Sequence, residues 1–207
     1  MLFILTGEIQ TGKTRWLQRL VDDLSAAGAP VRGAVAPGDW VRSDAGFEKL
    51  GIDNVLLPSG EVVRLARRRD LVRASDGLGA CRQSEGAGLG WAISDDALAR
   101  VDAHFARLAL GDRCADASHG ERAAHRPGLT VVDELGRLEL LLGGGLRHAL
   151  GLLESGPSSR WPHAIAVVRR DLAPIALERL SPAWGDVCSI VPDDTCAARV
   201  ERAVLGE

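Results

Sequence analysis

The segment that most constrains this chain is residues 7–14, which read Gly-Glu-Ile-Gln-Thr-Gly-Lys-Thr. Their spacing, G-x-x-x-x-G-K-[S/T], is that of the phosphate-binding P-loop, or Walker A motif. The apolar residues 1–6 precede the motif, and apolar side chains at helical spacing after it predict a helix from Gly12 to Ala27. A strand, a glycine-rich loop and a helix in this order are the context that the motif requires.

The chemistry of such a loop follows from its backbone and from two side chains. Lys13 would contact the β- and γ-phosphates, and the Thr14 hydroxyl would be a ligand of Mg²⁺. The start of the following helix would add its partial positive charge. The sequence therefore predicts a nucleoside triphosphate (ATP, GTP or another) as ligand and Mg²⁺ as cofactor. The backbone N–H groups expected to surround the phosphate oxygens belong to Gly7, Glu8, Ile9, Gln10, Thr11 and Gly12.

A second apolar segment supplies the carboxylates that a P-loop needs. Residues 129–132 are typical of a buried strand, and Asp133 and Glu134 follow directly. Ligands of parallel α/β sheets bind beyond the carboxyl ends of the strands. Asp133 would hold Mg²⁺ together with Thr14, and Glu134 would orient or deprotonate a water that attacks the γ-phosphate. The predicted catalytic residues are Lys13, Asp133 and Glu134.

The remainder of the chain alternates apolar strands with amphipathic helices. This alternation predicts an α/β fold, a three-layer sandwich with a mostly parallel sheet of P-loop NTPase type. Turn signals at 43–44, at Gly51 and at 58–60 predict a small antiparallel meander over residues 39–66. No repeat divides the chain, so we expect residues 1–207 to form a single domain. Further strands are expected at 31–36, 164–168 and 187–191, and further helices at 95–110, after 143–145, at 172–180 and at 195–204.

Two polar segments are predicted to lie outside the regular elements. Arg67-Arg68-Arg69 is expected to be a solvated surface turn, because no aromatic residues are interleaved as in a nucleic-acid patch. Residues 111–128 contain glycine, serine, histidine and arginine, and we expect a mobile loop there. Whether that loop is an insertion or a lid over a substrate stays open.

Composition limits the partners of the protein. The net charge of −3 gives no positive field, so no nucleic acid is expected as a partner. No apolar run approaches the ~20 residues of a membrane span. Four cysteines without a C-x-x-C pair read as reduced thiols, and the first strand leads directly into the P-loop, so a cytoplasmic location is expected. A protein partner stays open.

With these motifs the chain resembles the thermophile-type (cancer-related) nucleoside-triphosphatases, a family of P-loop NTPases. Members carry the P-loop at the extreme N-terminus and a signature D-E-[IL]-G-x-[ML]-E, which stands here at residues 133–139. Gly33, Arg42 and Gly46-Phe47 match the family stretch G-[FA]…R…G-F. The resemblance covers roughly residues 1–66 and 129–205.

The resemblance implies slow, Mg²⁺-dependent hydrolysis of nucleoside 5′-triphosphates to diphosphate and phosphate, with broad base tolerance. Glu139 belongs to the signature and would either fix the loop after the strand or help to position water. The chain departs from the family at 8–11, where many members have a Pro-Gly-Val-like run. Glu8 beside phosphates is unfavourable unless it points away or pairs with an arginine.

The small number of lysines limits how the protein could select a nucleotide base. Guanine readers of the G-protein type use an [N/T]-K-x-D loop, and the only lysines here are Lys13 and Lys49. Tight guanine selection by that device is excluded, and weak base specificity is expected.

Phosphoryl transfer usually needs a further cation besides the P-loop lysine. The accessory candidates are Arg42, Arg137 and Arg169-Arg170; a surface ion pair is the alternative for each, and one of them is expected to be the cation.

Two other functions stay open. One is a P-loop kinase that phosphorylates a nucleotide or small molecule. The other is a nucleotide-gated partner of another protein, with slow hydrolysis.

Overall fold

A single mixed sheet runs through the molecule. The structure is a computed structural model, and it describes residues 1–8, 10–43, 46–72, 80–117 and 126–206. Within these residues the sheet has nine strands in the order β6-β5-β4-β2-β7-β8-β1-β9, and β3 pairs with β4. Their bounds are β1 Leu2–Leu5, β2 Val31–Val35, β3 Gly38–Ser43, β4 Gly46–Leu57, β5 Glu61–Arg68, β6 Trp91–Ile93, β7 Leu129–Leu135, β8 His163–Val168 and β9 Val187–Ile190.

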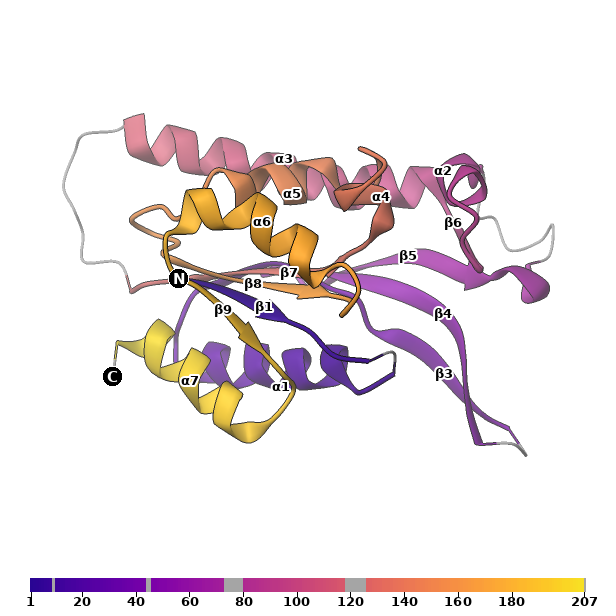
Figure 1. The fold of residues 1–207 in the computed structure, drawn as a ribbon, viewed down its shortest axis with the longest axis horizontal. Helices are drawn as coiled ribbons and strands as arrows, with labels where there is room; N and C mark the ends of the chain where they lie inside the picture. Colours follow the sequence, from indigo (N-terminus) through magenta and orange to yellow (C-terminus); the bar gives the residue numbers. More distant parts are fainter. Residues whose placement is uncertain (9, 44–45, 73–79, 118–125, 207) are drawn as a thin grey trace.

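Five strands form the parallel part of the sheet. β2 pairs with β7, β7 with β8, β8 with β1 and β1 with β9, all in parallel. The carboxyl ends of β1, β7 and β8 therefore meet at one edge, where the loop to α1 begins (Figure 1). This edge carries both motifs found in the sequence.

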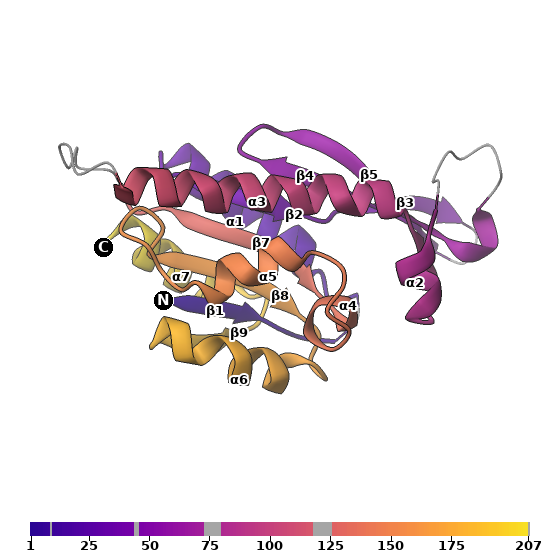
Figure 2. The same ribbon diagram turned by 90° about the horizontal axis from the view of Figure 1, so that it is seen from above.

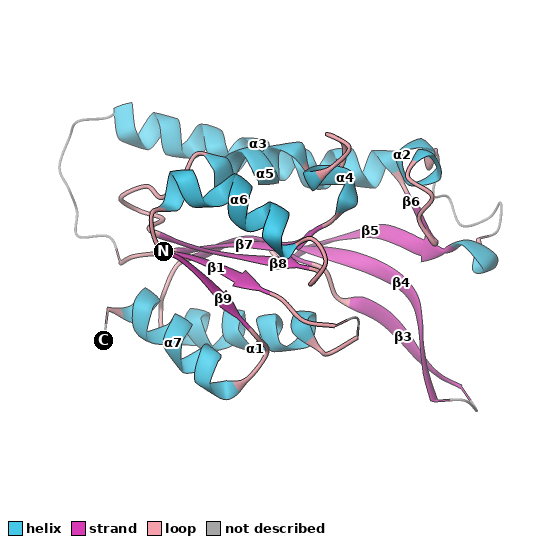
Figure 3. Ribbon diagram, viewed as in Figure 1, coloured by secondary structure: helices cyan, strands magenta, loops and turns pink. Residues whose placement is uncertain are grey.

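Helices cover both faces of the parallel part, as Figures 1 and 3 show from the side and Figure 2 from above. α1 and α7 lie on one face, and α3, α4, α5 and α6 lie on the other. The three-layer α/β prediction is thereby confirmed. The helix bounds are α1 Lys13–Ala26, α2 Arg82–Gly86, α3 Asp95–Ala117, α4 Arg137–Leu140, α5 Arg147–Glu154, α6 Ala173–Trp184 and α7 Asp194–Leu205, with a short 3₁₀ turn, η1, at Arg69–Leu71.

The core follows from the alternation of side chains along the central strands. In β1, Leu2 and Ile4 join the cluster under α3, α5 and α6, whereas Phe3 and Leu5 join the cluster under α1 and α7. All four are fully buried. A strand with both faces buried reads as a continuous apolar run, which is why the sequence identified these strands well.

The antiparallel part is larger than the predicted meander. β3, β4 and β5 form an antiparallel extension beside β2, and β6 adds a further strand that the sequence did not suggest. The turn predicted at Gly51 was wrong, because Gly51 lies inside β4. A Cβ there would be 2.9 Å from the Ala66 carbonyl oxygen and 2.5 Å from the Arg67 guanidinium on β5, so the glycine permits close strand pairing.

The arginine run was also placed wrongly as a surface turn. Arg67 and Arg68 are the last residues of β5, and only Arg69 begins the 3₁₀ turn. Ion pairs with Asp39 and with Glu48 and Asp70 hold the first two guanidinium groups along the sheet.

The polar segment after residue 110 differs from the prediction. Residues 111–117 continue α3, and residues 118–125 lie outside the described part of the chain. Arg32, buried on β2, binds both carboxylate oxygens of Asp112, at 2.6 and 2.7 Å, and its Nε donates to Thr130 on β7. This bidentate pair anchors the helix to the sheet two residues beyond the predicted end, and the polarity of the segment could not reveal it.

Of the helices described, none is long and apolar enough to cross a bilayer.

Candidate functional site

The P-loop connects β1 to α1 in a tight turn. Gly12 immediately precedes the helix with φ 81°, and Gly7 has φ 153°. Both positions therefore have a backbone conformation that favours glycine. Lys13 Nζ donates to the carbonyl oxygens of Gly7 at 3.0 Å and Glu8 at 2.6 Å, and the Thr11 hydroxyl donates to Glu8 at 2.9 Å. The Lys13 side chain thus lies across the loop that is predicted to bind phosphate. Ile9, predicted as part of the cradle, lies outside the described residues.

Glu8 is neutralised by an arginine from a distant segment. Its carboxylate accepts a hydrogen bond from Arg170 Nη1 at 2.7 Å, just after β8. Both side chains are exposed, so the pair contributes little to stability. It does offset a negative charge beside the loop, which answers the electrostatic objection to Glu8.

Asp133 lies at the centre of the site. Its side chain is buried at 3% exposure, near the end of β7, and it accepts a hydrogen bond from the Ala36 N–H at 3.0 Å. Burial raises the pKa of Asp133 to about 6, which nearby Glu134 reinforces, while the hydrogen bond from Ala36 and the side chain of Thr14 oppose it. The two residues predicted to hold Mg²⁺ are therefore neighbours in the site.

This pair suits Mg²⁺. Mg²⁺ is commonly held by one or two protein oxygens while substrate phosphates and waters complete its shell. A cation would also favour the ionised form of a carboxylate that burial otherwise disfavours. In the part of the chain that the structure describes, no group of three or more His, Cys, Asp or Glu residues could hold a metal by itself.

Glu134 lies beside Asp133 and is partly exposed. Its carboxylate accepts a hydrogen bond from Arg169 Nε at 2.8 Å. Among the predicted accessory arginines, Arg169 is thus the one with an ion pair to the Walker B carboxylates. Arg42 is exposed on β3 opposite Phe47, and Arg137 is exposed at the first residue of α4.

The pH dependence of stability offers a test of Asp133 that needs no substrate. Its folded-state pKa is raised, so its favourable contribution is complete below the ordinary value of 3.8 and is lost as the pH rises through about 6. Asparagine does not ionise, so Asp133→Asn removes this loss. In metal-free buffer, the free energy of unfolding of Asp133→Asn relative to the wild type should rise by about 2 kcal/mol between pH 4 and pH 7. Denaturant unfolding at several pH values measures it. Asp22→Asn, exposed on α1, is the control, and a gain independent of pH would contradict the assignment.

Glu139 fastens the segment that follows the carboxylates. One oxygen accepts from the Gly136 N–H at 2.8 Å and the other from the Leu146 N–H at 2.9 Å. The side chain is buried, and burial raises its pKa. Since both oxygens are engaged by backbone, the geometry supports the loop-fixing role over the positioning of water.

Removing that side chain should destabilise the protein. Glu139→Ala leaves two N–H groups without their acceptor, so we expect a loss of about 2–4 kcal/mol in the free energy of unfolding. Glu139→Gln keeps one acceptor oxygen and should lose about half as much. Denaturant unfolding measures both, and Glu178→Ala, at an exposed position of α6, should change stability by less than about 0.5 kcal/mol. Equal stability of all three variants would argue against this role.

Sequence reasoning missed Lys49. It lies on β4, and its interactions with Glu134 and Asp133 bring it into the electrostatic environment of the site. A signal was available, because it is one of two lysines in a chain whose 25 basic residues are otherwise arginine.

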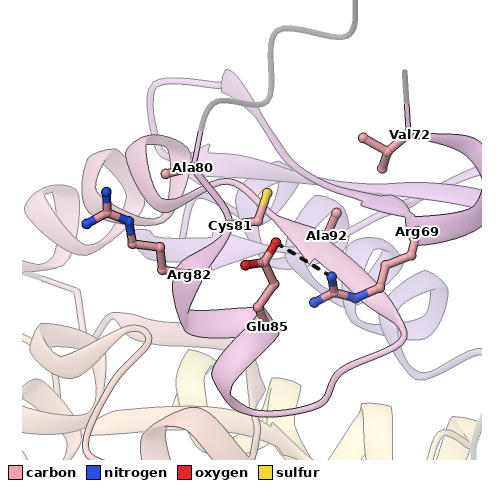
Figure 4. Close-up of a pocket in the computed structure, with 7 residues that line it drawn as sticks. All are labelled: Arg69, Val72, Ala80, Cys81, Arg82, Glu85 and Ala92. Carbon is pink, nitrogen blue, oxygen red and sulfur yellow. Dashed lines mark ion pairs between the residues drawn. The ribbon is translucent and has the colours of Figure 1, made fainter. Parts of the chain in front are cut away.

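A separate pocket lies beside α2 and β6. It has a volume of about 430 Å³. Arg69, Cys81 and Glu85 line it, with an ion pair of 3.9 Å between Arg69 and Glu85 (Figure 4). None of the predicted site residues belongs to its lining, so it is distinct from the candidate site.

Comparison with solved structures places the fold. The chain is similar to a human cancer-related nucleoside triphosphatase whose solution structure is known, with a TM-score of 0.56 and 19% sequence identity over 99% of this chain and 95% of that chain. At this identity the similarity shows the P-loop NTPase type of fold. No family model matches the sequence, and no curated protein sequence matches it.

Proposed function

We propose that the protein hydrolyses nucleoside 5′-triphosphates to diphosphate and phosphate, with Mg²⁺ and weak base specificity. The observation that carries the proposal is the buried Asp133 at the end of β7, whose carboxyl interacts with Thr14 of the P-loop and has Glu134 beside it. A P-loop hydroxyl and a strand-end carboxylate in contact are the usual protein contribution to a triphosphate–magnesium site. The fold shared with a nucleoside triphosphatase supports the same class of reaction.

Phosphate binding would use the loop backbone and Lys13. The N–H groups of the loop and the start of α1 would bind the phosphate oxygens, and the lysine ammonium would exchange its two loop carbonyls for phosphate oxygens. Thr14 and Asp133 would hold Mg²⁺, which neutralises charge on the transferring phosphoryl group when bound.

Glu134 would serve as the general base. A water oxygen attacks the γ-phosphorus, its proton passes to a Glu134 carboxylate oxygen, and the bond from phosphorus to the β–γ bridging oxygen breaks to release the diphosphate. Arg169, paired with Glu134 at 2.8 Å, would keep that carboxylate oriented and add positive charge near the transferred phosphoryl group. The γ-phosphorus thus loses its bond to the bridging oxygen and gains one bond to the oxygen of the water.

The identity of the nucleotide base is expected to have little effect on hydrolysis. Lys13 and Lys49 are the only lysines, and neither belongs to a guanine-reading loop of the [N/T]-K-x-D type. A P-loop kinase would need a lid over its acceptor, for which residues 111–128 are the candidate segment. Residues 111–117 belong to α3, and residues 118–125 lie outside the described residues.

Phosphate release from ATP, GTP, CTP and UTP, each with and without Mg²⁺, tests the proposal. Comparable Mg²⁺-dependent release from all four supports a nucleoside-triphosphatase of weak base specificity. Tight binding without release would instead favour an acceptor molecule or a protein partner. A rate of phosphate release that does not depend on Mg²⁺ would contradict the proposed metal site of Thr14 and Asp133.

A further inference from the structure

Lys49 is held in one place by its neighbours on the antiparallel extension. It is opposite Trp40 across the β3–β4 pair. A Cβ on Gly38 would lie 2.6 Å from Lys49 Cε and 2.5 Å from Trp40 Nε1, so both side chains cover this glycine closely. The ammonium nitrogen lies 5.5 Å from the centre of the Trp91 ring, within cation–π range. The lysine is therefore directed along the start of β3.

This position brings the charge of Lys49 within electrostatic reach of the carboxylates of the site. Gly38 comes two residues after Ala36, whose N–H donates to Asp133. In the sheet order β4-β2-β7-β8, Lys49 belongs to β4 on one side of β7, and Arg169 follows β8 on the other side. Two cations from separate elements thus interact with the Asp133-Glu134 pair.

Within the described part of the chain, the ammonium of Lys49 has no ion-pair partner. Partial burial lowers the pKa of Lys49, while the charges of Glu134 and Asp133 act in the opposite direction. Among the described residues, however, no carboxylate lies within 4.0 Å of its nitrogen, whereas Arg169 and Arg170 both have such a partner. A partly buried cation without a direct partner can accept an anionic ligand at little cost in broken contacts.

We propose that Lys49 binds the terminal phosphate of the nucleoside triphosphate and so distinguishes triphosphate from diphosphate. The inference rests on the nucleotide site of the proposed function. Lys13 lies across the P-loop, whereas Lys49 interacts electrostatically with Glu134, the residue proposed to activate the attacking water. Lys49 is thus a specificity-determining residue for the phosphate chain. The alternative role is purely structural, in which Lys49 only balances the charge of Asp133 and Glu134.

Equilibrium binding of two nucleotides separates these roles. The ligands are ADP and the non-hydrolysable β,γ-imido analogue of ATP, both with Mg²⁺. Lys49→Gln should weaken binding of the triphosphate analogue about 10-fold or more, as expected for loss of a charged hydrogen bond, and leave ADP binding within about twofold. Lys49→Arg should recover part of the lost affinity.

Two further variants sharpen the comparison. Gly38→Ala keeps every charge but displaces the lysine, so it should show the same selective loss, to a smaller degree. Arg64→Gln removes an exposed cation from neighbouring β5 and should bind both nucleotides as the wild type does. Thermal unfolding of each variant identifies any that fail to fold.

Each outcome bears on the proposal. Equal weakening of both nucleotides by Lys49→Gln, or no change in either, overturns the role of Lys49. A wild type that prefers the triphosphate analogue but releases no phosphate from ATP refutes hydrolysis and leaves the role of Lys49 intact. A wild type that binds neither nucleotide overturns both.

Discussion

Replacing Glu134 by glutamine should lower the rate of phosphate release by about 10²-fold or more while nucleotide binding stays within about twofold of the wild type. Glutamine keeps the size of the side chain and can still accept a hydrogen bond from Arg169 through its carbonyl oxygen. It cannot take the proton of the attacking water. Single-turnover phosphate release and equilibrium binding of the imido analogue measure the two quantities separately.

The chain offers a closely matched control in Glu154. Its carboxylate also pairs with an arginine Nε, from Arg179, and its exposure of 38% is close to the 39% of Glu134. It lies at the end of α5, away from the P-loop. Glu154→Gln should therefore leave both binding and release unchanged. Normal release by Glu134→Gln would exclude this carboxylate as the general base, and a parallel loss of binding would assign it a structural role instead.

The parts of the site that the sequence predicted are those built from contiguous residues. The P-loop and the Asp133-Glu134 pair are short motifs whose spacing fixes their geometry, and buried parallel strands read as apolar runs. The strand and helix that flank the P-loop follow from the same local patterns. The structure adds the proximity of Asp133 and Thr14, residues far apart in the sequence.

The parts that escaped prediction depend on partners distant in the chain. Residues 111–117 belong to a polar segment, yet they continue α3, and Asp112 near their start pairs with Arg32 on β2. Lys49 interacts electrostatically with Asp133 and Glu134 because β4 pairs with β2, which is itself beside β7. Arg170 neutralises Glu8 from 162 residues away. None of these contacts leaves a periodic or local signal.

The loss of Lys13 should have the largest effect of any single substitution. Lys13→Ala is expected to lower kcat/KM for ATP by about 10³-fold or more, the scale for removing a donor aimed at a charged transition state. Lys13→Arg should restore little, because a planar guanidinium cannot occupy the place of a compact ammonium. Arg19→Ala, exposed further along α1, removes a charge outside the loop and should leave kcat/KM unchanged.

The stability of the same variant decides how that loss is interpreted. In the absence of nucleotide, Lys13 makes hydrogen bonds to Gly7 and Glu8, and losing them should cost about 1 kcal/mol in the free energy of unfolding. A 10³-fold loss of kcat/KM corresponds to about 4 kcal/mol of transition-state stabilisation. A kinetic loss that exceeds the stability loss by this margin identifies Lys13 as a phosphate-binding residue. If hydrolysis persists in Lys13→Ala, residues 7–14 do not act as a P-loop.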